Sequence, residues 1–177
     1  LTTNDMTKRG FHIARWVSGL WYYLFQPPSV NIEFPYIGTT SFHTAYQGKT
    51  IYESGIGGIF ATNLILLPCL LFYKYRTKFR EKKVYLFICF NLIGAILIVC
   101  ADVQMGGLLT RYTADFTLMF YLAAYMILFT FIDEYYSQSN TLICSIPQTV
   151  WCRTLALLCC ITCLYLILSV FSLYVSG

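Results

Sequence analysis

Long apolar runs separated by short polar segments dominate the chain. No charged residue lies in residues 54–73 or in residues 84–101, and two further apolar runs cover residues 116–132 and 154–175. A helix rises about 1.5 Å per residue, so about twenty residues cross a hydrocarbon core of about 30 Å. The pattern predicts an all-α, polytopic transmembrane helix bundle with about four spans.

A shorter apolar run, residues 11–25, precedes these spans. It is rich in Trp and Tyr, contains Arg15 and is too short to cross a bilayer. We predict an interfacial helix from which Arg15 extends to water; the end of a longer span is the alternative. A long outer loop at residues 29–53 should follow.

This pattern divides the chain into two parts. Residues 1–53 hold the interfacial helix and the outer loop, and residues 54–177 hold the four-span bundle. The first residue is Leu1 rather than Met, and we expect the chain to be a fragment of a larger protein.

Several residues predict local features of the first two spans. The outer end of the first span is rich in small residues that would let another helix approach closely: Gly55, Gly57, Gly58 and Ala61. Pro68 should kink the same span, because proline cannot continue the helical hydrogen-bond ladder. Asn91 should hydrogen-bond to a neighbouring helix.

The charges are few and concentrated. Only 11% of residues are charged, against about 25% in an ordinary soluble domain. Six of the twelve basic residues lie in the turn between the first two predicted spans: Lys74, Arg76, Lys78, Arg80, Lys82 and Lys83. Cytoplasmic loops collect Lys and Arg, so we predict that this turn is cytoplasmic and contacts anionic lipid headgroups. We expect no nucleic-acid partner, because that needs a basic face with aromatic platforms.

The remaining loops follow from this orientation. Residues 102–115 become a second outer loop, and residues 135–153 become an inner loop that ends at Arg153. Asp133 and Glu134 should end the third span on the inner side.

The eight cysteines lie mostly in apolar runs. Cys159, Cys160 and Cys163 share one predicted helix, but no His, Asp or Glu lies in that run to complete a metal site. We therefore expect packing roles, no metal or cofactor and no structural disulfide. Cys144 and Cys152, near the predicted inner surface, are candidates for reversible acylation.

One polar cluster could carry chemistry, namely Arg111-Tyr112-x-x-Asp115-Phe116 with Asp102 at the other end of the same loop. If a helix starts near Thr110, Arg111 and Asp115 share a face. They could form an ion pair that pins the loop. They could instead line an outer pocket for an anionic headgroup or sugar phosphate, which the planar guanidinium fits. The predicted binding residues are Arg111, Tyr112, Asp115, Asp102, Glu33 and Glu53.

Four short motifs carry a family resemblance: Gln26-Pro27-Pro28, Phe34-Pro35, Tyr52-Glu53-Ser54-Gly55 and Arg111-Tyr112-x-x-Asp115-Phe116. Together they resemble the C-terminal part of large bacterial polytopic membrane proteins, among them multi-span lipid-linked-sugar glycosyltransferases. The resemblance implies the rear portion of a glycosyltransferase-like enzyme in the bacterial plasma membrane, using a polyprenyl-linked sugar donor on the outer face. The catalytic carboxylate of such enzymes lies in an early outer loop, so no catalytic residue is assigned here.

Two other functions remain open from the sequence. A transporter or flippase should have polar or broken helices near mid-membrane, and the nearly charge-free spans argue against this class. A structural membrane subunit without chemistry is the other alternative.

Overall fold

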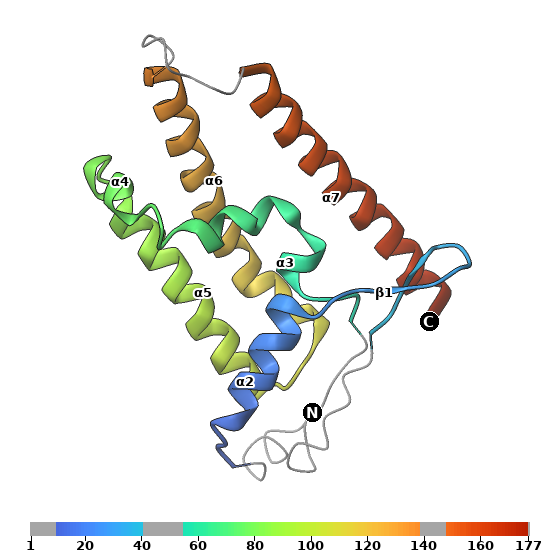
Figure 1. Ribbon diagram of the computed structural model, residues 1–177. Helices are drawn as coiled ribbons and strands as arrows, with labels where there is room; N and C mark the ends of the chain where they lie inside the picture. The colour runs from blue at the N-terminus through green and yellow to red at the C-terminus, as the bar shows by residue number, and fades with distance from the viewer. Residues whose placement is uncertain (1–9, 41–54, 139–147, 177) are drawn as a thin grey trace.

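The computed structural model describes residues 10–40, 55–138 and 148–176. Most of them are helical, as predicted (Figure 1). Three helices are long and apolar enough to cross a membrane: α5 (Tyr85–Met105), α6 (Thr113–Gln138) and α7 (Gln148–Ser176). This architecture is compatible with a multi-pass integral membrane protein.

The first predicted span, residues 54–73, is not one helix, and that prediction is wrong. Its described part forms a short helix α3 (Ile59–Thr62) and a 3-10 helix η3 (Leu64–Leu71), separated by Asn63 in a non-helical conformation. Pro68 lies within η3, so it does not kink a continuous α-helix as predicted. Its missing N–H and its ring are incompatible with an α-helical bond at that position. The described chain therefore has three candidate spans instead of four.

Side-chain hydrogen bonds stabilise the break between α3 and η3 at Asn63. The Asn63 amide donates to the Thr62 hydroxyl at 2.8 Å, and its oxygen accepts from the Tyr121 hydroxyl at 2.7 Å. Asn63 and Thr62 are both buried. Polar groups removed from water are costly unless they are hydrogen-bonded, so these contacts fix the break against α6.

The small residues before α3 serve close packing, as predicted, although the approaching element is a short one. The Gly58 N–H donates to the Gln26 carbonyl at 2.7 Å, and a Cβ at Gly58 would lie 2.5 Å from the Leu24 carbonyl carbon. Gly57 has φ +128°, a conformation that favours glycine. Glycine is therefore required where the two segments meet.

The N-terminal aromatic run forms α2 (Ala14–Leu20) and a π-helical segment η1 (Trp21–Phe25). The α2 helix packs along α5, with Gly19 against Val103 and the Trp16 indole donating to the Cys100 carbonyl at 3.1 Å. Arg15 is only 3% exposed and donates to the Gly10 carbonyl at 3.0 Å, so the prediction that it extends to water is wrong. This segment belongs to the bundle.

The described part of the predicted outer loop begins with a β-hairpin. Strand β1 (Ser29–Val30) pairs antiparallel with β2 (Ile37–Gly38). The hairpin extends alongside the C-terminal end of α7, where the Phe34 and Phe171 rings lie 5.6 Å apart (Figure 1). The remainder of that loop, including Glu53, lies outside the described residues.

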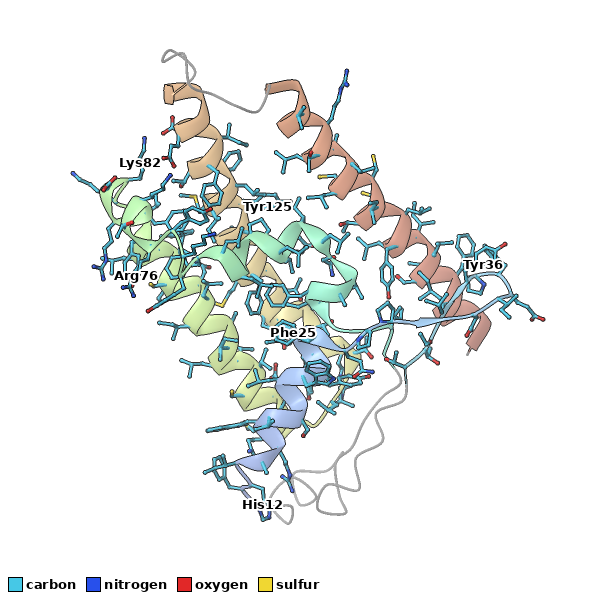
Figure 2. The ribbon with its side chains drawn as sticks, in the orientation of Figure 1. His12, Phe25, Tyr36, Arg76, Lys82 and Tyr125 are labelled. Atoms are coloured by element: carbon cyan, nitrogen blue, oxygen red, sulfur yellow. The ribbon has the colours of Figure 1, made fainter. Side chains whose placement is uncertain are left out.

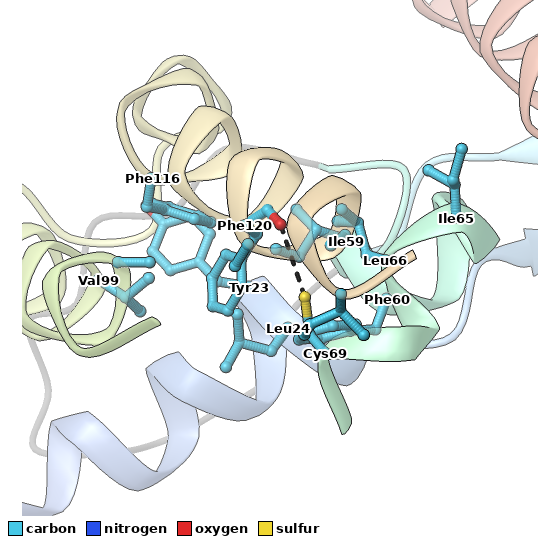
Figure 3. Packing of buried hydrophobic residues seen from close by; sticks show 14 of the residues in the cluster. Tyr23, Leu24, Ile59, Phe60, Ile65, Leu66, Cys69, Val99, Phe116 and Phe120 are labelled. Atoms are coloured by element: carbon cyan, nitrogen blue, oxygen red, sulfur yellow. Dashed lines mark hydrogen bonds between the residues drawn. The ribbon is translucent and has the colours of Figure 1, made fainter. Parts of the chain in front are cut away.

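Helices α5 and α6 pack against each other and hold the centre of the core. Figure 3 shows Tyr23, Phe116 and Phe120 meeting Leu66 and Cys69 there, with the Cys69 thiol 3.5 Å from the Phe120 carbonyl. Asn91, in α5, donates to the Phe87 carbonyl of its own helix at 2.9 Å. Among the described residues, Asn91 makes no side-chain hydrogen bond to a neighbouring helix, contrary to the prediction.

Both ends of α6 differ from the sequence prediction. Asp133 and Glu134 do not end the helix, which continues to Gln138. Asp133 forms an ion pair with Lys82 at 2.7 Å, and Glu134 forms one with Lys78 at 2.5 Å. Lys78 lies in α4 (Arg76–Glu81), and Lys82 follows it directly. The predicted outer loop at residues 102–115 is also shorter, because α5 extends to Met105 and α6 starts at Thr113.

The last helix, α7, packs chiefly on η3, α3 and β2. Its Tyr165 hydroxyl donates to the Ile56 carbonyl at 2.7 Å. Arg153 lies within this helix, so the predicted inner loop at 135–153 contains helical residues at both ends. Most of the α7 span is exposed, which suits a helix that faces lipid.

Candidate functional site

The predicted polar cluster lies where α5 ends and α6 begins, at the end of the bundle away from α4 (Figure 1). The Asp102 carbonyl accepts from the N–H groups of Gly106 and Gly107, at 2.8 and 3.0 Å, and so closes α5. Gly107 has φ +92°, which reverses the chain. A 3-10 turn, η4 (Thr110–Tyr112), then leads into α6.

Tyr23 holds this connection from η1. Its hydroxyl accepts from the Leu109 N–H at 2.8 Å and lies 3.1 Å from the carbonyl oxygens of Gly107 and Leu109. A phenol has one hydrogen, so it donates to one of these carbonyls at a time. Tyr23 is 2% exposed, and burial raises the pKa of its hydroxyl above the ordinary value. The hydroxyl therefore stays protonated and positions η4.

A second contact from the N-terminal segment supports the same end of α5. The Gln104 amide donates to the His12 carbonyl at 2.6 Å, and the His12 N–H lies 3.4 Å from the Gln104 side-chain oxygen. The sequence gives no sign of the roles of Tyr23 and Gln104, whose partners are more than 80 residues away in the chain. No local pattern marks them.

The predicted ion pair between Arg111 and Asp115 is not formed. Among the residues that the structure describes, side-chain ion pairs join only Lys78 to Glu134 and Lys82 to Asp133. Arg111 lies in the 3-10 turn instead of the α-helix that carries Asp115, so the expected i, i+4 geometry is absent. The interpretation of this pair as a structural clamp is therefore wrong.

Arg111 lies over the neighbouring aromatic ring instead. Its guanidinium carbon is 5.4 Å from the Tyr112 ring centroid, and the Arg111 side chain is exposed. A cation over an aromatic face is stabilised by the ring quadrupole and keeps its N–H donors available. Arg111 can therefore offer its donors to a ligand.

The two carboxylates of the cluster differ in environment. One oxygen of Asp102 is buried and has no hydrogen-bond partner within the described chain. Asp115 is exposed in the first turn of α6, where the helix N-terminus favours a negative charge. Asp115 is close enough to act electrostatically on Asp102. A buried carboxylate oxygen without a donor is costly, so this position invites a polar ligand.

The structure does not bring Glu33 to this cluster. Glu33 is exposed in the turn between β1 and β2, and its carbonyl accepts from the Tyr36 N–H at 2.8 Å. Figure 2 shows Tyr36 near the C-terminal end of α7, away from the end of α5. Glu53 lies outside the described residues. The candidate site therefore consists of Asp102, Arg111, Tyr112 and Asp115.

The opposite end of the bundle carries the basic turn. Lys78 and Lys82 are paired with the carboxylates of α6, and hydrogen bonding to Asp133 raises the pKa of Lys82. Aromatic rings contact most of the remaining basic residues: Arg76 lies 4.6 Å from the Tyr73 centroid and Arg80 lies 4.8 Å from that of Tyr85. The structure thus has two chemically distinct ends.

Comparisons with protein-family models, with curated proteins and with solved structures find no match to this chain. The resemblance to lipid-linked-sugar glycosyltransferases therefore stays a prediction.

Proposed function

We propose that the chain is the rear portion of a glycosyltransferase-like membrane enzyme that uses a polyprenyl-linked sugar donor. The observation that carries this proposal is the exposed guanidinium of Arg111, which lies over Tyr112 and has no carboxylate partner within the described chain. It lies in the turn between α5 and α6, at the end of the bundle away from α4, where a phosphate attached to a lipid would reach it. A planar guanidinium binds phosphate oxygens through two parallel N–H groups.

The carboxylates suit the sugar part of such a donor. Asp102 and Asp115 offer acceptors for hydroxyl groups, and Asp102 has a buried oxygen that lacks a donor among the residues that the structure describes. A sugar hydroxyl would supply that hydrogen bond. We assign these residues to binding and assign no catalytic base to the chain.

The proposal also includes orientation. The basic turn, with its exposed Lys and Arg side chains, would lie on the cytoplasmic side of a bacterial plasma membrane and contact anionic headgroups. The Arg111 end would then face outward. The separation of the two ends in Figure 1 supports this arrangement.

Substitution of Arg111 tests the donor site. In the full-length protein, Arg111→Lys should preserve the melting temperature but weaken binding of a polyprenyl-phosphate-linked sugar by about tenfold or more, because one charge-assisted hydrogen bond contributes about 1.5–3 kcal/mol. Binding is measured by native mass spectrometry and transfer by product formation. Arg153→Lys, an exposed arginine on α7, is the matched control. Equal donor binding by the two variants would contradict the proposal.

One observation favours a transporter or flippase as the second candidate. Discontinuous helices form the substrate sites of many transporters, and the segment before α4 is broken at the buried Asn63. A flippase would move a fluorescent lipid-linked sugar across proteoliposome membranes. Asn63→Ala should abolish that movement while leaving donor binding at Arg111 intact. Absence of both binding and movement in the wild-type protein would leave a structural subunit.

A further inference from the structure

An apolar groove runs along the exposed side of α5, next to the basic turn. It has a volume of about 340 Å³ and almost no polar surface. Five of its lining residues recur at helical spacing on α5, and the sixth follows η3: Cys89, Leu92, Ile93, Ile96, Leu97 and Phe72. Residues spaced by three and four share one face of a helix, so the groove follows the helix axis.

An aromatic stack joins this groove to the basic turn. The Phe72 ring, which lines the groove, stacks on Tyr85 with centroids 5.5 Å apart. The Arg80 guanidinium carbon lies 4.8 Å from the centroid of the same Tyr85 ring. Arg80 is therefore one aromatic ring away from the groove, and Arg76 lies one helical turn earlier on α4.

The basic residues of the turn fall into two groups. Lys78 and Lys82 are paired with carboxylates of α6. Within the described part of the chain, the other four are exposed and have no carboxylate partner: Lys74, Arg76, Arg80 and Lys83. Figure 2 shows Arg76 beside α5, whereas Lys82 lies at the end of α4 toward α6. Of these four, Arg80 lies on the Tyr85 ring that stacks on the groove residue Phe72, and Arg76 lies beside α5, so these two arginines flank the groove.

The length of this surface matches one leaflet of a bilayer. Tyr85 and Leu97 are twelve residues apart on α5, which corresponds to about 18 Å. Half of a hydrocarbon core of about 30 Å is about 15 Å. The surface from the Tyr85 ring to the end of the groove at Leu97 therefore covers about one leaflet.

We propose that the groove and the two unpaired arginines beside it form a binding site for one phospholipid with an anionic headgroup. Its phosphate would contact Arg76 and Arg80, and one acyl chain would lie in the groove. The inference rests on the proposed contact of the basic turn with anionic headgroups and adds the acyl-chain groove. It does not rest on the sugar-donor proposal.

Charge and length select this occupant over others. A zwitterionic phospholipid would leave Arg76 and Arg80 without a net counter-charge. A spanning helix, from a second copy or another protein, would need a complementary face across the whole core, but the groove covers about half of it. A free phosphate would leave the groove unused.

Competition between two phospholipids tests the headgroup. The full chain in detergent receives equal amounts of phosphatidylglycerol and phosphatidylcholine with identical acyl chains, and native mass spectrometry counts the bound molecules. The wild-type protein should prefer phosphatidylglycerol. Each basic residue near an anionic surface contributes a factor of about five, so Arg80→Gln should lower the preference about fivefold and Arg76→Gln/Arg80→Gln about thirtyfold. Arg153→Gln replaces another exposed arginine, on α7, and should leave the preference for phosphatidylglycerol unchanged.

A larger side chain in the groove tests the acyl-chain site. Ile93 is 59% exposed and lines the groove, whereas Leu86 is 78% exposed on the same helix and does not. Ile93→Trp should reduce bound phosphatidylglycerol at least about fivefold, because the indole would displace CH₂ groups of the acyl chain from the groove, while Leu86→Trp should not. Melting temperatures equal to the wild-type value establish that both variants fold.

Four outcomes would overturn the inference. These are equal binding of the two phospholipids by the wild-type protein, equal effects of Arg80→Gln and Arg153→Gln, displacement of the lipid by millimolar inorganic phosphate, and a dimer that Ile93→Trp dissociates. Equal effects of Ile93→Trp and Leu86→Trp would overturn the groove alone and leave the headgroup contact standing. A wild-type preference that disappears in high salt supports the inference without any variant.

Discussion

The hydroxyl of Tyr23 should be worth about 1 to 3 kcal/mol of stability. Tyr23→Phe removes one oxygen atom from a side chain that is 2% exposed. The hydroxyl accepts one bond from the Leu109 N–H and donates one to the carbonyl of Gly107 or Leu109, so two bonds are lost at once. Hydrogen bonds between membrane helices average about 0.6 kcal/mol and reach about 1.7 kcal/mol, which gives this range for two.

Equilibrium unfolding by SDS from mixed micelles measures the loss. Tyr73→Phe is the matched control, because it removes the same atom from a ring that is 73% exposed. Hydrogen exchange gives a local readout: the Leu109 amide should exchange up to about sixteenfold faster in Tyr23→Phe, because its one lost bond contributes at most about 1.7 kcal/mol and 1.4 kcal/mol is a factor of ten. A free energy of unfolding within about 0.5 kcal/mol of the control, with unchanged Leu109 exchange, would refute the reasoning.

The same hydroxyl predicts a pH dependence. Burial raises the pKa of Tyr23 in the folded protein above the value of 10.0 expected in the unfolded chain. Its contribution to stability is therefore complete below pH 10 and is lost as pH rises from there toward the folded pKa. The difference in unfolding free energy between the wild type and Tyr23→Phe should shrink above pH 10.

Three further predictions address packing, orientation and charge. Gly58→Ala should destabilise the protein by about 3 kcal/mol in SDS unfolding, because the new methyl would overlap backbone atoms, whereas Gly94→Ala meets only a flexible methionine side chain and should cost less than about 1 kcal/mol. In intact cells an impermeant thiol reagent should label Met105→Cys and not Thr77→Cys; the reverse would invert the proposed orientation. The hydrogen bond to Asp133 on α6 raises the pKa of Lys82. The ion pair therefore stabilises the folded protein below the pKa of 10.5 expected in the unfolded chain, and this stabilisation is lost as the pH rises above it. Thermal melts of the wild type and Lys82→Gln should converge above that pH, and curves that stay parallel would show that the pair contributes nothing.

The candidate spans could be read from the sequence because their signal is compositional. Helices α5, α6 and α7 coincide with apolar runs long enough for a bilayer, and such a run has few alternatives to helix in lipid. Hydropathy measures the transfer of side chains and carries no information on backbone conformation. Residues 64–71 are as apolar as α5 yet form a 3-10 helix, because Asn63 and Pro68 interrupt the α-helical pattern.

The candidate site was predictable in location and not in geometry. Asp102, Arg111, Tyr112 and Asp115 do lie at one end of the bundle, since chain connectivity alone places them there. The expected pairing assumed a regular helix from Thr110, and the 3-10 turn removes that spacing.

Residues that act through distant partners could not be found in the sequence. Tyr23 is one of fifteen tyrosines, and its partner Leu109 lies 86 residues away. Asp133 and Glu134 looked like a helix end because charges normally leave the membrane. Neutralisation by Lys78 and Lys82 allows α6 to continue through them.

The interruption at Asn63 has a consequence for biosynthesis. A nascent helix enters the membrane alone only when its own backbone bonds are complete, and α5, α6 and α7 meet that condition. The segment from α3 to η3 does not, because it is not one continuous α-helix; its buried Asn63 side chain accepts a hydrogen bond from Tyr121 on α6, and α7 packs on η3. Those partners emerge from the ribosome after it. We therefore expect the middle of this chain to enter the membrane only after the later helices have entered, so that its order of insertion would differ from its order of synthesis.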